Sequence, residues 1–468
     1  MSQSSNKPYG HAVVIGASIA GLLAAATASQ TFQRVTLIER DQLDDVAEPR
    51  KGVPQGALAH VLLPVGLDRI EMVLPGLRED LLASGASLFD ASGDTAVLTS
   101  TGWMVRTKGP EWVACRRPIV ELCVRRRVQA IQNVEFKGAS VGGLAVGESE
   151  GRKIVTGVKL RDGSVIEADF VINATGRRTK SIDWLAEHGV SAPRESFVNG
   201  YVGYATQYIR LAGNPFKHGV MGIGALPWPG ETRGVALYPT DNGLHALTAI
   251  GAMRDYPARD SKEVAEFIRS GVCPVVADLI EGAEPVSEVY TYHIDGSLLR
   301  HWKEVADLPD RFVTIGDAAA SMNPVFGQGM SLSASATMVL KSVLESSETL
   351  DGLAKKVHQQ VAPILEGAYA VATSFDAAFD GAEWSEDFTP MNDAAKEFGL
   401  ALQVLSTERA DISAVLNSSM SNLRPEELGA SFVSEACGEW LKGSRSVAPF
   451  DRAEYPQAVY AVSEAEVA

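Results

Sequence analysis

Hydrophobic and polar positions repeat with different periods along this chain, and the changes of period predict its elements. An apolar run at 11–15 leads into a glycine-containing turn and an alanine-rich stretch. A second apolar run follows at 35–38. This order predicts a strand, a helix and a parallel strand, which form one βαβ unit over residues 11–41.

Two later parts of the chain show related patterns. Residues 116–131 predict a helix, and a strand at 311–315 precedes a long helix at 328–346 that is rich in Ala and Ser. Strand-like runs lie between these helices, at 133–146, 154–161 and 164–173. We expect one α/β domain to be assembled from segments that are separated in the sequence.

From 196 to 300 the pattern changes to alternating apolar and polar residues with several tyrosines, which predicts an antiparallel sheet interrupted by a helix at 261–271. Beyond residue 350 the pattern is helical. The predicted helices there cover 366–380, 392–422 and 425–442. The last 20 residues are expected to form a loose tail.

The first turn carries the chemistry of a dinucleotide-binding fingerprint. Gly16 permits the tight turn, Ser18 is small enough for a pyrophosphate to approach, and Gly21 allows the helix to pack close to the strand. Glu39 ends the second strand, where a carboxylate accepts ribose hydroxyls and favours FAD or NAD. The neighbouring Arg40 would instead suit a 2′-phosphate.

Composition excludes several partner classes. The chain has 468 residues, 46% hydrophobic and 21% charged, and its formal net charge of −16 makes nucleic acid or an anionic membrane an unexpected partner. No apolar run is long enough to span a bilayer and no leader precedes the first strand, so we expect a cytoplasmic protein. The four cysteines lack metal-ligand spacing, which predicts reduced thiols and no metal site.

Three segments together resemble the FAD motifs of the class A flavoprotein monooxygenases, the group built like p-hydroxybenzoate hydroxylase. The first is the fingerprint from Gly16 to Gly21. The second is Ile172 to Arg178, in which Thr175 replaces the aspartate of the family. The third is Gly316-Asp317-Ala318-Ala319, followed by Pro324-Val325-Phe326-Gly327-Gln328-Gly329-Met330.

The resemblance implies FAD as cofactor and a Rossmann-like FAD-binding domain with an inserted antiparallel β-sheet substrate domain and a helical C-terminal region. The expected boundaries are 1–75, 111–185 and 300–350 for the FAD-binding domain, 76–110 and 186–299 for the substrate domain, and 351–468 for the helical region. In the family, Asp317 would bind the ribityl chain and Arg117 would approach the phosphates. Asp317 as a helix cap and Arg117 as a surface residue are the structural alternatives. The expected cofactor-binding residues are Gly16, Ala17, Ser18, Gly21, Glu39, Arg40, Arg117, Asp317, Pro324, Gly327, Gln328, Gly329 and Met330.

A narrower resemblance connects residues 49–60, 74–77 and 323–331 to the actinobacterial epoxidases that act on polyene precursors and to flavin-binding decalin-forming cyclases. Ala57-Leu58 and Gln328 differ from histidine-containing positions of the epoxidases. The expected function is flavin-dependent epoxidation or hydroxylation of a hydrophobic, polyketide-like polyene, with NAD(P)H as a transient reductant. The alternative is a redox-neutral [4+2] cyclase that forms a trans-decalin in spirotetronate or spirotetramate biosynthesis. A reductase of isolated double bonds is a third possibility.

Few residues are predicted to line the substrate pocket, and each of them could instead have a structural role. His60 would lie near the flavin, or would serve as a structural histidine. The aromatic residues of the predicted sheet would line a substrate chamber or belong to its core; they are Tyr201, Tyr204, Trp228 and Tyr238. No residue is assigned a catalytic role, and the oligomeric state is left open.

Overall fold

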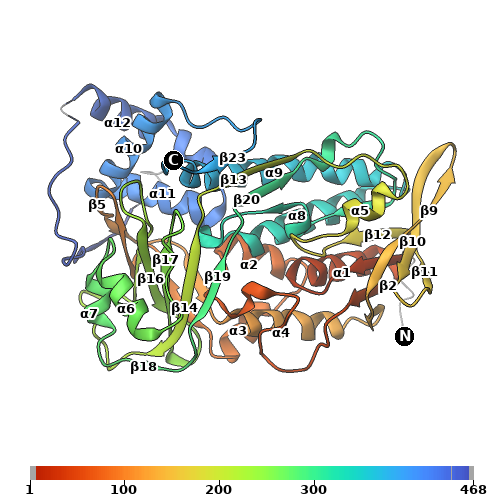
Figure 1. The fold of residues 1–468 in the computed structure, drawn as a ribbon, viewed down its shortest axis with the longest axis horizontal. Helices are drawn as coiled ribbons and strands as arrows, with labels where there is room; N and C mark the ends of the chain where they lie inside the picture. The colour runs from red at the N-terminus through yellow and green to blue at the C-terminus, as the bar shows by residue number, and fades with distance from the viewer. Residues whose placement is uncertain (1–6, 444, 463–468) are drawn as a thin grey trace.

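A five-stranded parallel sheet forms the centre of the domain that contains the first glycine-rich turn (Figure 1). The computed structural model describes residues 7–443 and 445–462. Strands from distant parts of the chain are neighbours in this sheet, in the order β21 (Phe312–Thr314), β12 (Phe170–Asn173), β1 (Tyr9–Ile15), β2 (Phe32–Glu39) and β8 (Val134–Gly138). All of these pairings are parallel. The prediction that separated segments build one α/β domain is therefore confirmed.

Helices pack on this sheet, and α1 lies between α4 and α8. Their bounds are α1 (Ile19–Thr31), α4 (Arg117–Gln129), α5 (Ser181–Ala186), α8 (Gly329–Ser346) and α9 (Leu353–Asp376). A small antiparallel sheet contributes to the same core and packs against β12. Its strands are β9 (Val141–Ser149), β10 (Arg152–Leu160) and β11 (Val165–Glu167). The close approach of α1 to the first turn depends on Gly21, because a Cβ there would lie 1.7 Å from the carbonyl oxygen of Gly16.

A second, larger sheet is almost wholly antiparallel and forms the other main part of the molecule (Figure 1). Its strands are β18 (Glu284–Pro285), β14 (Gly203–Arg210), β17 (His245–Gly251), β16 (Arg233–Pro239), β15 (Gly222–Ala225), β4 (Thr95–Thr99) and β5 (Gly102–Trp103), with β19 (Tyr290–His293) also paired to β14. One face packs against α6 (Ser261–Arg269) and α7 (Val275–Leu279) in a separate hydrophobic core. The opposite face is turned toward the three motif segments, residues 16–21, 172–178 and 316–330, which are called the flavin segments below.

A four-stranded sheet connects the two parts. Its strands are β22 (Ala320–Ser321), β20 (Ser297–Arg300), β13 (Glu195–Asn199) and β23 (Glu383–Trp384). The C-terminal helices form a third core of their own; they are α10 (Asp393–Glu408), α11 (Ala410–Asn422) and α12 (Ser431–Lys442). Helix α9 instead shares the core of the parallel-sheet domain, which it joins through residues from Leu353 to Ala372.

Short elements complete the described chain. They are η1 (Pro54–Ala57), α2 (Pro64–Glu71), α3 (Leu77–Ala83), β3 (Ser87–Asp90), β6 (Arg106–Thr107), β7 (Glu111–Ala114), η2 (Asp241–Gly243), η3 (Trp302–Glu304), η4 (Gly316–Ala318), η5 (Pro324–Phe326), η6 (Pro425–Gly429) and β24 (Val459–Tyr460).

Two sequence-based expectations are corrected. The single helix expected over 392–422 is two helices, because Arg409 adopts an extended conformation between them. The described part of the tail is not loose: β24 pairs with β6, and Tyr455 is buried against the second core. Aromatic anchors of this kind have no periodicity that a sequence pattern would reveal.

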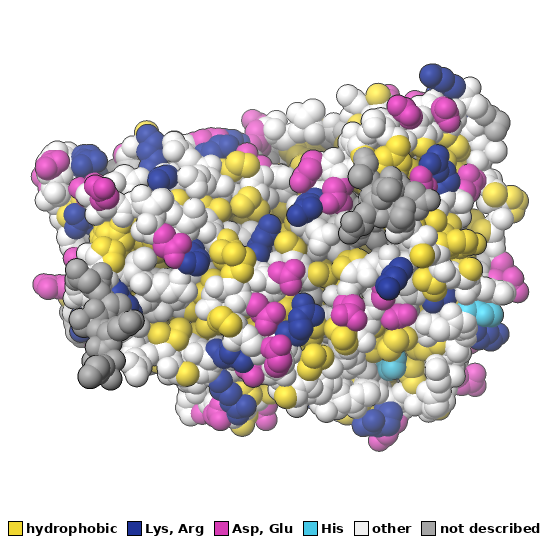
Figure 2. Space-filling model, turned by 180° about the vertical axis from the view of Figure 1, so that it is seen from behind, with side chains coloured by type: hydrophobic (Ala, Val, Ile, Leu, Met, Phe, Trp, Pro, Cys, Tyr) yellow, Lys and Arg dark blue, Asp and Glu magenta, His cyan; other side chains and the backbone are white. Residues whose placement is uncertain are grey.

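Acidic and basic side chains lie interspersed over the rear face of the molecule (Figure 2). Among the described helices, none combines the length and the apolar character that crossing a membrane would require.

Candidate cofactor and substrate site

The first motif closes around the carboxylate of Glu39. Gly16 turns the chain with a φ of +97°, and the Ala17 N–H donates to Glu39 Oε2 at 2.8 Å. The N–H groups of Arg40 and Asp41 donate to Glu39 Oε1 at 2.8 and 3.0 Å. A carboxylate has about four acceptor sites, so this buried group keeps capacity for a further donor such as a ribose hydroxyl. Arg40 contributes its backbone here, while its side chain is exposed.

Arg50 reinforces this end of the site. Its guanidinium lies 3.3 Å from Glu39 and 2.6 Å from Glu121, and it donates to the Ala17 carbonyl at 2.9 Å. These partners neutralise its charge, so Arg50 holds the first motif in place.

Arg117 opens helix α4 and points at the start of helix α1. Its Nη2 donates to Ser18 Oγ at 3.1 Å and lies 3.6 Å from Glu121. The side chain is only about 6% exposed, yet its Nε and Nη1 have no hydrogen-bond partner among the described residues. Buried donors are rarely left unsatisfied. Two free guanidinium donors beside a helix N-terminus fit a phosphate, since both features attract an anion.

The second and third segments meet beside Arg117. Asp317 lies in η4, and its pKa is raised by burial, while the nearby charges of Arg117 and Arg177 oppose that rise. Gly316 has a φ of +61°, and a Cβ there would lie 2.6 Å from the Cβ of Ala20, so η4 sits directly against α1. The arginine–aspartate pair is thus placed where a polyol and a phosphate would both find partners.

In the second segment, Thr175 replaces the expected acid with a neutral network. Its Oγ1 donates to Asn173 Oδ1 at 2.7 Å and lies 2.8 Å from Thr179 Oγ1. Arg177 then donates to the carbonyls of Gly296 and Asp295, both at 2.7 Å. These bonds tie the turn to the chain that enters β20.

The third segment forms a loop that leads into helix α8. Gly327 has a φ of +63°, and a Cβ built on Gly329 would meet nothing within 4 Å, so the backbone around the start of the helix is open. Gln328 is buried, and its Oε1 lacks a hydrogen-bond partner within the described part of the chain. Pro324 is exposed, whereas the Met330 side chain belongs to the core and leaves only its backbone for a ligand.

One face of the large sheet lies opposite these segments. The Tyr204 hydroxyl donates to Asn323 Oδ1 at the start of the third segment, and the Tyr208 hydroxyl donates to the Leu58 carbonyl at 2.9 Å. Tyr238 lies on the same face because it pairs with Ala246, which in turn pairs with Tyr208. Burial raises the pKa of all three phenols, so they are neutral at physiological pH.

This face has open space at one small residue. Gly224 and Ala236 are paired on it, and a Cβ built on Gly224 would meet nothing within 4 Å. Gly234 shares this side by alternation, but a Cβ there would lie 2.6 Å from Pro227. The recess in the sheet surface is therefore local to Gly224.

His60 lies where the cofactor segments and the sheet face meet. Its Nδ1 is 2.9 Å from the Leu58 carbonyl oxygen. Burial, together with the charge of Arg117, lowers the pKa of His60 to about 4. The imidazole is therefore neutral at physiological pH, and its approach to the flavin stays a prediction.

Two expected pocket residues lie elsewhere. Trp228 packs against the core on the far side of the sheet, where Arg452 covers its ring at 5.6 Å. Tyr201 precedes the sheet and stacks under the Arg254 guanidinium at 3.3 Å near the surface. The aromatic pattern predicted a sheet without showing on which side these two residues fall.

Sequence reasoning missed two tyrosines of β19. Tyr290 and Tyr292 pair with Thr206 and Tyr204, so alternation turns them to the flavin-side face. The pKa of Tyr292 is raised by burial, with smaller effects from charges such as those of Arg177 and Asp317. Their i, i+2 spacing was the available signal.

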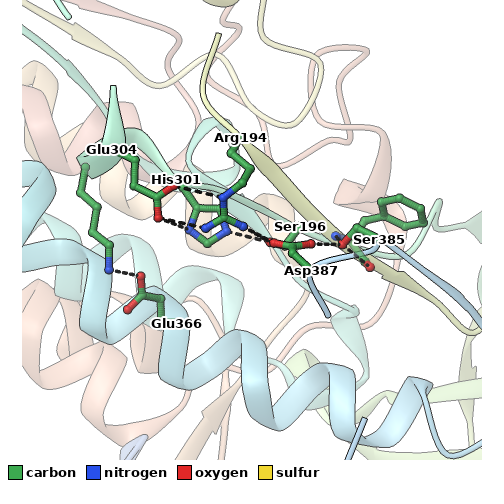
Figure 3. A network of polar contacts seen from close by, with 9 residues as sticks. Arg194, Ser196, His301, Glu304, Glu366, Ser385 and Asp387 are labelled. Atoms are coloured by element: carbon green, nitrogen blue, oxygen red, sulfur yellow. Dashed lines mark hydrogen bonds and ion pairs between the residues drawn. The ribbon is translucent and has the colours of Figure 1, made fainter. Parts of the chain in front are cut away.

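A serine, a histidine and an acid also cluster away from this site (Figure 3). Ser196 Oγ lies 2.7 Å from His301 Nε2, and His301 Nδ1 lies 3.6 Å from Glu304. This order suggests a hydrolytic triad. However, the Ser196 hydroxyl donates to the Asp387 carboxylate, and Arg194 binds both Asp387 and Glu304. These hydrogen bonds and ion pairs therefore have a structural role, because they join β13, η3 and the segment after β23.

Within the described ranges, no group of three His, Cys, Asp or Glu side chains is arranged to hold a metal ion. The four cysteines are free and buried.

Comparison with known proteins identifies the family. The FAD binding domain family matches residues 10–356, and the chain belongs to it. FAD is accordingly its cofactor, and the unpartnered donors of Arg117 and the free capacity of Glu39 fit that molecule. Among curated sequences, the chain is 30% identical over 346 residues to Protein Rv3254 of Mycobacterium tuberculosis, covering 71% of this chain and 72% of that protein.

Solved structures confirm the fold. The flavin-dependent brominase Bmp2 matches with a TM-score of 0.65 at 14% identity, over 93% of this chain and 99% of Bmp2. PqsL, a probable FAD-dependent monooxygenase from Pseudomonas aeruginosa, matches with a TM-score of 0.59 at 16% identity, over 79% of this chain and 96% of PqsL. The chain thus has the p-hydroxybenzoate hydroxylase type of fold expected from its motifs.

Proposed function

We propose that this chain is an FAD-dependent monooxygenase that epoxidises or hydroxylates a hydrophobic, polyketide-like polyene. The observation that carries the proposal is the tyrosine-lined face of the large sheet opposite the flavin segments, on which the charged pair of Arg210 and Glu284 lies at the outer end of β14. A hydrophobic small molecule is the partner that such a face suits.

The composition of this face supports an apolar substrate. Among the described strand positions turned to this side, one carries a charge: Arg210, at the outer end of β14. The strands considered are β4, β14, β15, β16, β17 and β19. Arg116 approaches the Tyr208 ring at 5.9 Å, but it is paired with the buried Asp241 at 2.8 Å. A charged substrate would lose its hydration on this face without gaining an unpaired opposite charge, which is unfavourable. An apolar substrate would release water from its surface, which is favourable.

The chemistry of these residues supports oxygen transfer to an alkene. FAD supplies the oxidising chemistry when it is bound. The protein would bind and orient the alkene and exclude water, without a general acid or base. The tyrosines and His60 are neutral at physiological pH, so they line the chamber without acting as strong bases. NAD(P)H is the proposed reductant and would visit the flavin transiently.

The same face also supports the redox-neutral [4+2] cyclase as a second candidate. A cycloaddition needs a shaped recess that folds a diene onto its dienophile, and the open space at Gly224 would form part of such a recess. FAD would then shape the chamber without being reduced.

Incubation of the holoprotein with a linear polyene distinguishes these candidates. The proposal expects a product heavier by one oxygen that requires both NADPH and air. An isomer of unchanged mass, formed without oxygen or reductant, would replace it with the cyclase. A product heavier by two hydrogens, formed with NADPH but without oxygen, would indicate a double-bond reductase. The flavin-stripped apoprotein serves as the control and should form none of these products.

A further inference from the structure

A buried polar network within the third segment joins its loop to β20, β14 and α9 immediately before Pro324. Asn323 is about 1% exposed, and its backbone N–H donates to Ser297 Oγ of β20 at 3.0 Å. Its side-chain Oδ1 accepts from the Tyr204 hydroxyl of β14 and from the Val325 N–H at 3.2 Å. Its Nδ2 donates to Asp376 Oδ1 of α9 at 2.7 Å. Asn323 is therefore held from three sides while it caps the turn η5.

Asp376 is an unusual partner for this position. It ends helix α9, where the helix dipole is unfavourable for a negative charge, and it is about 1% exposed. Its hydrogen-bond donors are the neutral Asn323 amide and the Ser297 hydroxyl, at 3.4 Å. No cation pairs with it among the described residues.

The surroundings of Asp376 contain few other titratable groups. Tyr204 faces it from β14, and Tyr369 approaches it from an earlier turn of α9. Burial raises the pKa of both phenols, so they stay neutral. The backbone at Gly200 closes another side, because a Cβ there would lie 3.3 Å from Asp376. Burial also raises the pKa of Asp376 itself to about 6.

We propose that Asp376 is a positioning residue for the flavin loop, and that its ionised carboxylate orients Asn323 and thereby holds the loop from Pro324 to Met330 in the FAD-binding conformation. The ionised form accepts from both Asn323 and Ser297. A protonated carboxyl would still accept from Asn323, but more weakly, because the hydrogen bond would no longer be charge-assisted. Its O–H would also donate to Ser297 Oγ, the same oxygen that accepts the backbone N–H of Asn323. The Asn323 cap on η5, and with it the backbone that leads into α8, would then loosen.

Ionised Asp376 holds the flavin loop in position but lowers the stability of the folded protein. The folded-state pKa of Asp376 lies above its ordinary value of 3.8, so folding disfavours the ionised form. The loss of folding stability that results is absent below pH 4, grows as the pH rises to about 6, and is constant above that. The functional form of the residue is thus the one that destabilises the fold. A residue with a purely structural role would show the opposite relation.

The test uses FAD binding alone and is independent of the reaction catalysed. FAD is titrated into the full-length apoprotein from pH 5 to 8, with quenching of flavin fluorescence and the visible flavin spectrum as readouts. For the natural chain, the Kd should rise as the pH falls through about 6, by at most about tenfold per pH unit. Asp376→Asn should show a weak Kd that does not change over this range. Its apoprotein should melt at a higher temperature than the natural chain at pH 8 and at the same temperature near pH 4.

Two further variants make the test selective. Asp380→Asn removes an exposed carboxyl four residues along and should leave the Kd and its pH dependence unchanged. Ser297→Ala removes one donor to the carboxylate, so it should move the midpoint of the pH dependence upward. An unchanged pH dependence in Asp376→Asn would overturn the proposal. So would a loss of apoprotein stability in that variant at pH 8, or an unmoved midpoint in Ser297→Ala.

Discussion

Replacement of Arg117 by glutamine should separate cofactor binding from protein stability. The side chain is buried, and its Nε and Nη1 have no partner among the described residues, so both donors are available to a phosphate. A hydrogen bond to a charged group contributes about 1.5–3 kcal/mol. Loss of two such bonds, at about 1.4 kcal/mol per factor of ten, predicts an FAD Kd that rises about 100-fold or more.

The apoprotein should be affected much less. Glu121, which loses Arg117, keeps its 2.6 Å contact with Arg50. The variant also removes a buried cation whose pKa is lowered by desolvation, so the charge itself contributes little to folding. We expect apoprotein melting temperatures within a few degrees of each other, and loss of the rise in melting temperature that saturating FAD gives the natural chain.

Fluorescence-quenching titrations and thermal melts, each with and without FAD, measure both effects. Arg126→Gln is the matched control, because this residue lies on the same helix in an exposed ion pair with Asp45. A third readout is His60, whose pKa should rise when the charge of Arg117 is removed. An unchanged Kd in Arg117→Gln would refute the assignment of its free donors to the phosphates. A Kd that changes equally in both variants would do so too.

Three further predictions concern other parts of the molecule. Gly21→Ala should abolish FAD binding or folding, because the new Cβ would lie 1.7 Å from a backbone oxygen, and circular dichroism with a flavin titration will show which. Gly224→Leu should fill the recess and weaken binding of a polyene by about tenfold or more. Its FAD Kd should stay unchanged, and a parallel loss of FAD would contradict the placement of the recess. Arg106→Ala should lower the free energy of unfolding by about 3 kcal/mol or more, since three carbonyl groups lose a buried donor at 2.7–3.1 Å; an unchanged denaturant midpoint would count against this role.

The parts of the site that were predictable are those dictated by backbone sterics. The turn from Gly16 to Gly21 needs small residues at set spacings, and Glu39 follows at the end of the next strand, so these positions were found from the pattern. Arg117 and Asp317 were found through the order of the motifs, and the structure brings both to the same place.

The rest depended on contacts between distant segments. Asp376 and Asn323 are 53 residues apart and neither position stands out in its own segment, so no local pattern predicts their hydrogen bond. Trp228 is a residue that the sequence pattern placed in the pocket and that lies elsewhere. An aromatic residue in a sheet region was expected in the pocket, but the turn that leads into β16 directs it to the other core. Which side of a sheet a residue outside the strands occupies is decided by tertiary packing.

Titration of the flavin-stripped protein with FAD tests the central claim most directly. Three segments distant in sequence converge on one buried arginine with free donors, and this geometry predicts one tightly bound FAD per chain with a shifted visible spectrum. Binding should be strongly weakened by Arg117→Gln and not by Arg126→Gln. A chain that stays colourless at micromolar FAD, or that binds it equally well without Arg117, would contradict the account.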